Sequence, residues 1–254
     1  MKFENTEVWG FQGALRGMRN PKESWNKSDS GYCGSNYCNQ CHDNNICGEY
    51  YHGFGAGCKH EGEYIIGKND MRLAQQLIRA GSEHRKFMRQ IVVSVDITAP
   101  LYWWKEFDTY KIGTVANSTS TMHKLATTPI SLECFETDDY EGMIVGEGFE
   151  DIVDSVDKII EFCEDLRKRY LETNDIRYWK ELIRWLPESW LQTRTVTMSY
   201  ENLLAMCSKG QRRFHKLTEW SKLFIGWART LPYAQELIFL DELEENNKEE
   251  IRDI

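Results

Sequence analysis

The chain has 254 residues, of which 41% are hydrophobic, and a formal net charge of −9. That length and apolar content are enough to bury a substantial core. No block of Lys and Arg accompanies the acidic balance, so polymeric nucleic acid is not an expected partner. The first residues lack an apolar signal core, and no run of about 18 apolar residues predicts a membrane span. We therefore expect a cytoplasmic protein with reduced cysteines.

Residues 31–63 form a Cys/His-rich insert. Cys38 and Cys41 make a C-x-x-C pair, whose spacing lets two thiolates bind one tetrahedral metal. The insert has little apolar content, so a structural zinc would supply the ordering energy that burial cannot. A disordered reduced loop and a redox role are the alternatives. The preferred zinc ligands are Cys33, Cys38, Cys41 and Cys58, and the alternates are Cys47, His42, His52 and His60.

Hydrophobic periodicity predicts a helix-rich α+β protein. Asn69 or Asp70 caps a first helix, residues 91–98 alternate as a strand, and Pro100 opens a short aromatic helix. Further helices are expected over 150–172, 178–186, 199–210 and 217–231, and a further strand over 193–198. The aromatic stripe of the last helix is expected in a core or subunit interface.

We expect one domain over residues 1–254. It ends in an acidic tail, 241–254, which holds seven acidic and two basic residues.

Small hydroxyl side chains recur between Thr109 and Thr121, and Lys111 and His123 flank most of them. Such groups hydrogen-bond a phosphate, ribose or base, and Lys111 is the expected cation for the phosphate. The same residue types also form turns and helix caps, because their side chains bond nearby backbone. Both interpretations stay open at this point.

Five sequence motifs carry a family resemblance. Ala99-Pro100-Leu101-Tyr102 follows the predicted strand, and Thr109-Tyr110-Lys111 precedes the hydroxyl run. This order resembles the Ala-Pro helix start and the R-H-R-x-x-S-x-N-x-x-S motif of the flavin-dependent thymidylate synthases, the ThyX family. The motif's Ser, Asn and second Ser correspond to Thr114, Asn117 and Ser120. The family's L-P, N-A-R-S-L and Q-W-E elements are similar to Leu186-Pro187, Ser199-Tyr200-Glu201-Asn202-Leu203 and Glu219-Trp220.

The resemblance spans residues 65–240 and implies a ThyX-like fold with a small central antiparallel or mixed sheet. It implies bound FAD reduced by NADPH, and methylene transfer from methylenetetrahydrofolate to dUMP to give dTMP. It also implies a homotetramer that binds a small-molecule nucleotide. No catalytic residue is assigned. The implied FAD-binding residues are Tyr110, Lys111, Thr114 and Asn117. The implied nucleotide-binding residues are Ser118, Ser120, Thr121, His123, Arg194 and Glu201.

The chain departs from the family pattern at charged positions. The R-H-R motif reads Thr109-Tyr110-Lys111, and the Arg of N-A-R-S-L reads Glu201. Replacing Arg by Glu near a phosphate reverses the local charge and should weaken dUMP binding. We therefore expect weak thymidylate synthesis, with kcat/KM lowered by about 10² to 10⁴. The alternatives are a non-catalytic nucleotide-binding protein of this fold with a zinc-stabilised insert, and an unrelated zinc-stabilised interaction protein.

Overall fold

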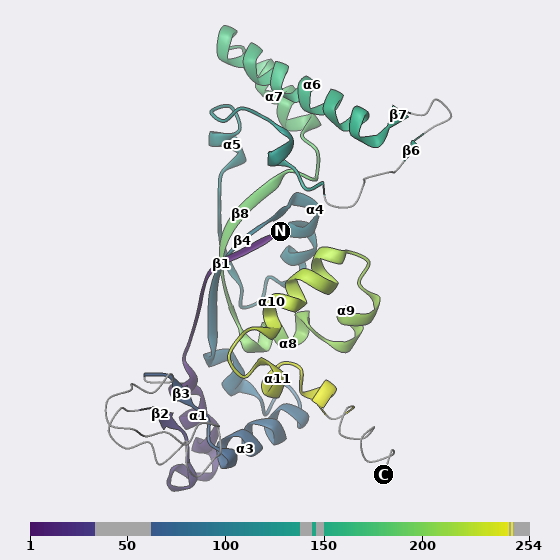
Figure 1. Cartoon of the computed structure of the whole chain (residues 1–254). Helices are drawn as coiled ribbons and strands as arrows, with labels where there is room; N and C mark the ends of the chain where they lie inside the picture. The colour runs from purple at the N-terminus through teal and green to yellow at the C-terminus, as the bar shows by residue number, and fades with distance from the viewer. Residues whose placement is uncertain (34–61, 138–143, 146–149, 244, 246–254) are drawn as a thin grey trace, which may run out of the picture. The chain divides into compact units, whose positions relative to one another are not determined.

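The computed structural model describes residues 1–33, 62–137, 144–145, 150–243 and 245 (Figure 1). The chain divides into two compact units. Unit 1 contains Met1–Thr6 and Ser94–Thr197, and unit 2 contains Glu7–Val93 and Met198–Ile254. The single domain expected over 1–254 stays a prediction.

A four-stranded sheet has the order β1-β4-β8-β5. Its strands are β1 (Lys2–Trp9), β4 (Val92–Pro100), β5 (Val115–Ser118) and β8 (Leu191–Ser199). The two strands predicted from the sequence, β4 and β8, are confirmed. In β4 the apolar side chains of Val93, Val95, Ile97 and Ala99 are buried, while the alternating polar ones are only half-buried. The edge strands β1 and β5 carry no such alternation, so periodicity did not reveal them.

Unit 1 also contains α4 (Leu101–Phe107), η4 (Asp108–Tyr110), α5 (Thr121–Lys124), η5 (Leu132–Cys134), β6 (Ile144–Val145), β7 (Glu150–Asp151), α6 (Ile152–Thr173) and α7 (Ile176–Trp185). The expected helix over 150–172 is α6, and α7 begins at an Asp175 cap. A core cluster between these helices and the 125–135 segment includes Leu125, Phe135 and Cys163.

Unit 2 begins with α1 (Phe11–Arg19), η1 (Asn20–Lys22), η2 (Trp25–Lys27), β2 (Gly31–Tyr32), β3 (Tyr64–Ile65), α3 (Lys68–Arg79) and η3 (Lys86–Gln90). The expectation that Asn69 or Asp70 caps α3 was wrong, because Gly67 is the N-cap. Asp70 is instead fully buried, and it accepts from Arg19 at 2.5 Å and from the Ser28 and Ser30 hydroxyls at 2.6 Å. A buried carboxylate needs such partners, and here they outcompete a capping role.

The C-terminal part of unit 2 contains α8 (Tyr200–Met206), α9 (Lys209–Phe214), η6 (Glu219–Phe224), α10 (Ile225–Arg229) and α11 (Ala234–Leu237). Ser199 and Asn202 form a capping box at the start of α8, as the sequence predicts for Ser199. The expected helix over 199–210 ends earlier, as α8, and a separate helix, α9, begins at Lys209. The aromatic stripe is core, since Trp220 and Phe224 are fully buried and Trp227 nearly so.

The described part of the Cys/His-rich insert is its base. There β2 pairs antiparallel with β3, and the Cys33 N–H donates to the Glu63 carbonyl at 2.8 Å. Cys33 is buried. The other proposed zinc ligands, Cys38, Cys41 and Cys58, lie outside the described residues, as do the alternates. The zinc site therefore stays a prediction.

Candidate functional site

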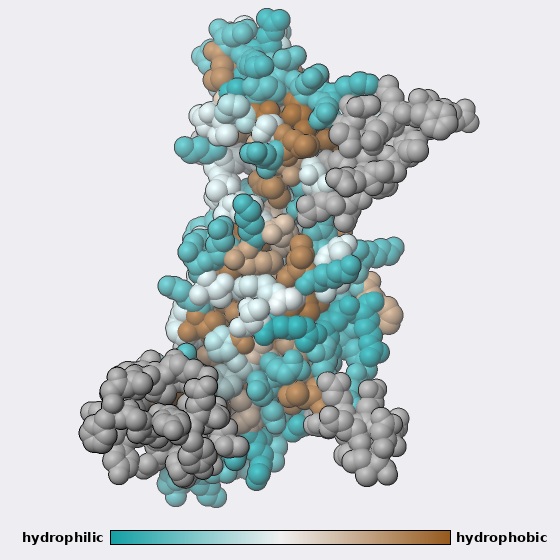
Figure 2. Space-filling view, viewed as in Figure 1, coloured by the Kyte–Doolittle hydropathy of each residue, from teal (hydrophilic) through white to brown (hydrophobic). Residues whose placement is uncertain are grey.

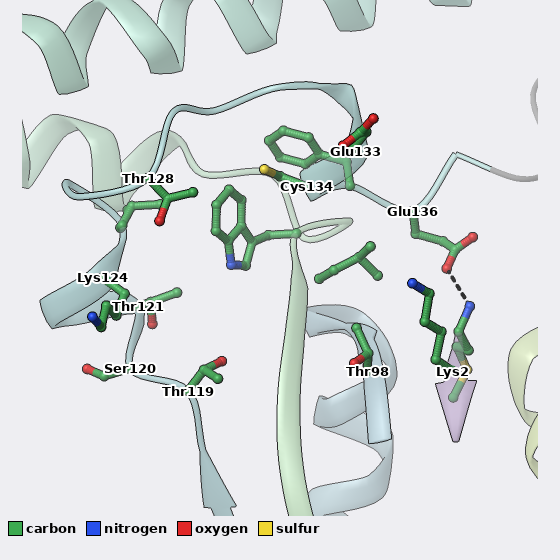
Figure 3. Close-up of a pocket in the computed structure, with 15 residues that line it drawn as sticks. Lys2, Thr98, Thr119, Ser120, Thr121, Lys124, Thr128, Glu133, Cys134 and Glu136 are labelled. Carbon is green, nitrogen blue, oxygen red and sulfur yellow. Dashed lines mark hydrogen bonds and ion pairs between the residues drawn. The ribbon is translucent and has the colours of Figure 1, made fainter. Parts of the chain in front are cut away.

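A cavity of about 460 Å³ lies within unit 1. Its walls combine five hydroxyl side chains, four charged side chains and an apolar surface (Figure 3). The hydroxyl side chains are those of Thr98, Thr119, Ser120, Thr121 and Thr128. The volume falls within the range of about 300–1,000 Å³ that is typical of small-molecule sites.

The sheet fixes one wall of this cavity. Alternation along β4 turns Thr98 to the less buried face, where its hydroxyl lies 2.8 Å from that of Thr193 on β8. The Thr119 N–H donates to the Thr193 carbonyl at 2.9 Å. The Gln192 side-chain amide donates to the Thr119 carbonyl at 2.9 Å. These bonds hold the chain after β5 against β8.

Helix α5 continues this wall. The Lys124 N–H bonds the Ser120 carbonyl at 3.0 Å, and the Leu125 N–H bonds the Thr121 carbonyl at 3.1 Å. One helical turn therefore places Lys124 near the hydroxyls that begin it. Figure 3 shows Ser120, Thr121 and Lys124 together on one side of the cavity.

An ion pair on α6 fixes the segment that carries Thr128. Arg167 donates to both Glu164 oxygens, at 2.6 and 2.7 Å, and to the Ala126 carbonyl at 3.1 Å. Glu164 also accepts the Ile130 N–H at 2.9 Å. The hydrogen bonds from Arg167 are the main reason that the pKa of the Glu164 carboxyl lies below its ordinary value. Neither side chain lines the cavity, so Arg167 and Glu164 act by holding the segment that carries Thr128.

The charged groups divide the cavity into two ends. Lys124 lies at the hydroxyl end, and Glu133, Glu136 and Lys2 lie at the other (Figure 3). Glu136 accepts from the Met1 amino group at 3.3 Å. Among the described residues, neither Lys2 nor Lys124 forms an ion pair. A ligand with one anionic end would therefore bind with that end near Lys124.

Apolar side chains complete the walls. Leu125, Phe135, Trp190 and Leu191 line the cavity, and the Phe135 and Trp190 rings meet edge to face at 5.4 Å. A half-buried indole beside hydroxyl groups suits a flat polar ring such as a pyrimidine. Cys134 also lines the cavity and is only partly buried. In unit 2, burial raises the pKa of the Cys207 thiol to about 12.

Only some of the binding residues predicted from the sequence line this cavity. Ser120 and Thr121 line it, whereas Ser118 does not. The four implied FAD-binding residues lie on η4, on the following loop and on β5, and they do not line it either. Lys111 and Asn117 are exposed, and Thr114 donates to the Tyr110 carbonyl at 2.9 Å. The His123 side chain lies outside the described part of the structure.

Arg194 and Glu201 have partners within their own units. Arg194 donates to Gln192 and to Asp108, both at 2.9 Å, and its guanidinium lies 4.2 Å from the centre of the Trp104 ring. Glu201, in the first turn of α8, accepts from Arg85 Nε at 2.9 and 3.0 Å. Arg85 therefore neutralises the Glu201 carboxylate. Neither residue lines the unit 1 cavity.

Sequence reasoning missed much of this site. Lys124 follows Ser120 by one helical turn, a spacing that the sequence displays. Lys2, Thr98, Cys134 and Trp190 come from distant segments, and only the fold brings them to the cavity.

A second cavity, of about 1,050 Å³, lies within unit 2. Its apolar lining comes from Met18, Leu73, Leu77 and Phe87. Its basic lining includes Lys22, Lys27 and Lys86, with His84 among them. This combination can hold a flat aromatic ring that carries phosphate groups.

The described residues contain no group of three or more His, Cys, Asp and Glu side chains arranged to hold a metal ion. In the same residues, no helix combines the length and the apolar character needed to span a membrane.

Comparisons with known proteins agree with the fold. No family model matches the sequence, and no curated protein matches it. The structure is similar to that of the flavin-dependent thymidylate synthase ThyX from Helicobacter pylori, complexed with FAD and dUMP. The identity is 14% and the TM-score 0.57, over 95% of this chain and 99% of that one.

A second similar structure is the UMP/dUMP methylase PolB from Streptomyces cacaoi, bound with 5-Br dUMP. The identity is 16% and the TM-score 0.50, over 68% of this chain and 82% of that one. The likeness to ThyX along almost the whole chain confirms the expected α+β, ThyX-like fold.

Proposed function

We propose that this protein is a diverged, FAD-dependent enzyme that resembles thymidylate synthase and acts on a pyrimidine deoxynucleotide. The default reaction is conversion of dUMP to dTMP. The observation that carries the proposal is the unit 1 cavity, where Ser120, Thr121 and Lys124 form one wall and Trp190 lines the cavity with them. The structural neighbours were crystallised with nucleotides, which supports a nucleotide ligand.

The cavity suggests an orientation for the nucleotide. The phosphate lies at the hydroxyl end, where Lys124 supplies the charge and Ser120 and Thr121 supply neutral hydrogen bonds. The pyrimidine lies against Trp190, towards the end with Glu133 and Lys2. A carboxylate accepts the ring N–H of uracil, and an ammonium donates to a ring carbonyl. The same ammonium can stabilise negative charge that develops on that carbonyl.

We assign FAD to the unit 2 cavity. Its volume of about 1,050 Å³, its apolar lining and its three lysines match a large aromatic cofactor with phosphates. When bound, the flavin supplies the hydride chemistry, and the protein binds and orients the reactants. Tyr110, Lys111, Thr114 and Asn117 lie in unit 1 and stay the FAD contacts that the ThyX resemblance implies, as a proposal separate from the unit 2 cavity. NADPH and methylenetetrahydrofolate are the proposed co-substrates.

We also propose a homotetramer and a cytoplasmic location. Exposed apolar side chains support an assembly. Ile112 is 92% exposed and Val115, on edge strand β5, is 65% exposed. Hydrophobic patches also interrupt the hydrophilic surface of the α6–α7 hairpin (Figure 2), where Phe162 and Ile176 are exposed. Contiguous apolar patches on a surface are typical of subunit contacts.

A second function follows from the charge pairing. Arg194 is bound to Asp108, and the position of the family's helix Arg is Glu201, bound to Arg85. Because these arginines are held in internal ion pairs, they are not available to stabilise the transition state of a bound nucleotide. The alternative is a non-catalytic nucleotide-binding protein of the same fold, with a zinc-stabilised insert.

Three measurements test these functions. Purified protein is examined for flavin absorption near about 450 nm, for dUMP binding by calorimetry, and for dTMP formation with FAD, NADPH and methylenetetrahydrofolate. Flavin, dUMP binding and slow dTMP formation support the enzyme. Nucleotide binding without flavin or product supports the non-catalytic protein. Absence of nucleotide binding refutes both.

A further inference from the structure

A cluster of basic side chains lies within unit 2, apart from the residues discussed above. Helix α9 contributes Lys209, Arg212 and Arg213, η6 contributes Lys222, and α10 contributes Arg229. All of these except Lys209 line a cavity of about 260 Å³. The segment after α11 brings three carboxylates to the cluster, from Asp241, Glu242 and Glu245.

The inner half of the cluster is a fixed network. Arg212 donates to Asp241 at 2.5 Å and to Glu242 at 2.7 Å, and Arg229 bonds both oxygens of Glu242 at 2.7 and 2.8 Å. The Phe239 ring is fully buried beside both guanidinium groups, which lie 5.6 and 4.2 Å from its centre. These contacts hold the two arginines in fixed orientations.

The outer half is held loosely. Glu245 accepts from Lys209, and from Arg213 at 3.5 Å. The side chains of Glu245 and Arg213 are 41% and 57% exposed, so water and salt screen their pairs. Lys222 is exposed, and it forms no ion pair among the described residues. A stronger anion can therefore replace the Glu245 carboxylate at little cost.

We propose that Arg213 and Lys222, which lie beside Arg212 of the inner half, form a binding site for a phosphate group, and that Glu245 occupies this site as a tethered competitor. A phosphate oxyanion offers more charge and more acceptor oxygens than one carboxylate. The cavity has room for it: a Cβ added to Gly226, which lines the cavity, would meet no atom within 4 Å. The C-terminal segment thereby lowers the affinity of the site for phosphate.

Inorganic pyrophosphate is the probe, titrated calorimetrically into the full-length chain at low salt. Glu245→Gln should tighten its binding about 3- to 10-fold, because the competing charge is gone. Adding Arg213→Ala and Lys222→Ala to that variant should weaken binding at least about 10-fold. An unchanged affinity in either comparison would overturn the proposal.

A steric test leaves every charge in place. Gly226→Leu projects a side chain into the cavity and should abolish pyrophosphate binding. Gly13→Leu, at another exposed helical glycine with open space around it, should leave binding unchanged. Equal effects of the two substitutions would contradict the site.

The source of the phosphate is tested with ADP. Equal affinity for ADP and pyrophosphate shows that only the phosphates are recognised. Tighter binding of ADP, removed by Gly226→Leu, identifies a nucleoside diphosphate as the ligand. Binding of either ligand that is insensitive to Gly226→Leu rejects this cavity.

Discussion

The unit 1 cavity and the C-terminal cluster of unit 2, formed by the basic side chains of α9, η6 and α10 with the carboxylates after α11, both contain cations, but the cations have different partners. In the unit 1 cavity, Lys2 and Lys124 have no ion-pair partner among the described residues. In the C-terminal cluster, Arg212 and Arg229 are bound to carboxylates of the same chain. Cations that stabilise the fold are already neutralised, whereas unpaired cations in a cavity are available to an anionic ligand. Counting charges in the sequence does not separate these two kinds.

Neighbouring arginines of α9 give the sharpest test of this difference in stability. Arg212→Ala should lower the free energy of unfolding by about 2–4 kcal/mol, because it leaves the Asp241 and Glu242 carboxylates short of a partner. Arg213→Ala should change it by less than about 0.5 kcal/mol, since that side chain pairs only weakly and in solvent. Urea denaturation measures both. Similar losses of unfolding free energy from the two substitutions would contradict the distinction between neutralised and available cations.

Two lysines of unit 1 test whether an unpaired cation in the cavity binds the nucleotide phosphate. Lys124→Ala should lower dUMP affinity by about 1.5–3 kcal/mol, the loss of a charge-assisted hydrogen bond. Lys111 is the cation that sequence analysis predicts for the phosphate, and it is exposed outside the cavity. Lys111→Ala is the matched control variant. Calorimetry measures the dUMP affinity of both variants. A loss confined to Lys111→Ala would move the phosphate to the loop before β5.

The ion pairs of Glu242 in the C-terminal cluster should make the free energy of unfolding depend on pH. This effect should be smaller than those of the substitutions above. Hydrogen bonding to Arg229, then the charge of Arg212, holds the pKa of Glu242 below its ordinary value. The carboxylate therefore adds stability above the unfolded-state pKa of about 4.3, and this stability is lost as the pH falls through the lower folded-state pKa. Urea unfolding between about pH 6 and pH 3 should show a steeper loss in the wild type than in Glu242→Gln. Parallel curves would refute this assignment.

The sequence predicted what depends on neighbours along the chain. Alternation identified β4, and β-branched residues identified β8. The Ser199 cap identified the start of α8, and helical spacing identified the buried Trp220 stripe. Ser120 and Thr121, which the family resemblance implies as nucleotide-binding residues, line the unit 1 cavity. Their role in binding a nucleotide stays a prediction.

The rest depends on contacts between distant segments. Asp70 reads as a helix cap in sequence, but Arg19 and Ser28 make it a buried ion-pair partner. Arg194 reads as an available cation, but Asp108 lies far from it in sequence and pairs with it. Trp190 and Cys134 enter the cavity through the fold alone. Such pairings carry no local signal, so periodicity and spacing do not predict them.

The central claim is that the unit 1 cavity holds the nucleotide, and the Cys134 thiol within it offers the most direct test. Cys134 is the partly buried thiol among the four described cysteines, since Cys33, Cys163 and Cys207 are buried. The measurement is the alkylation rate of the Cys134 peptide by mass spectrometry, with and without dUMP at a concentration that saturates the calorimetric signal. We predict that dUMP slows alkylation at least about 10-fold in the wild type, and much less in Lys124→Ala at the same concentration. An alkylation rate that saturating dUMP leaves unchanged would contradict the account.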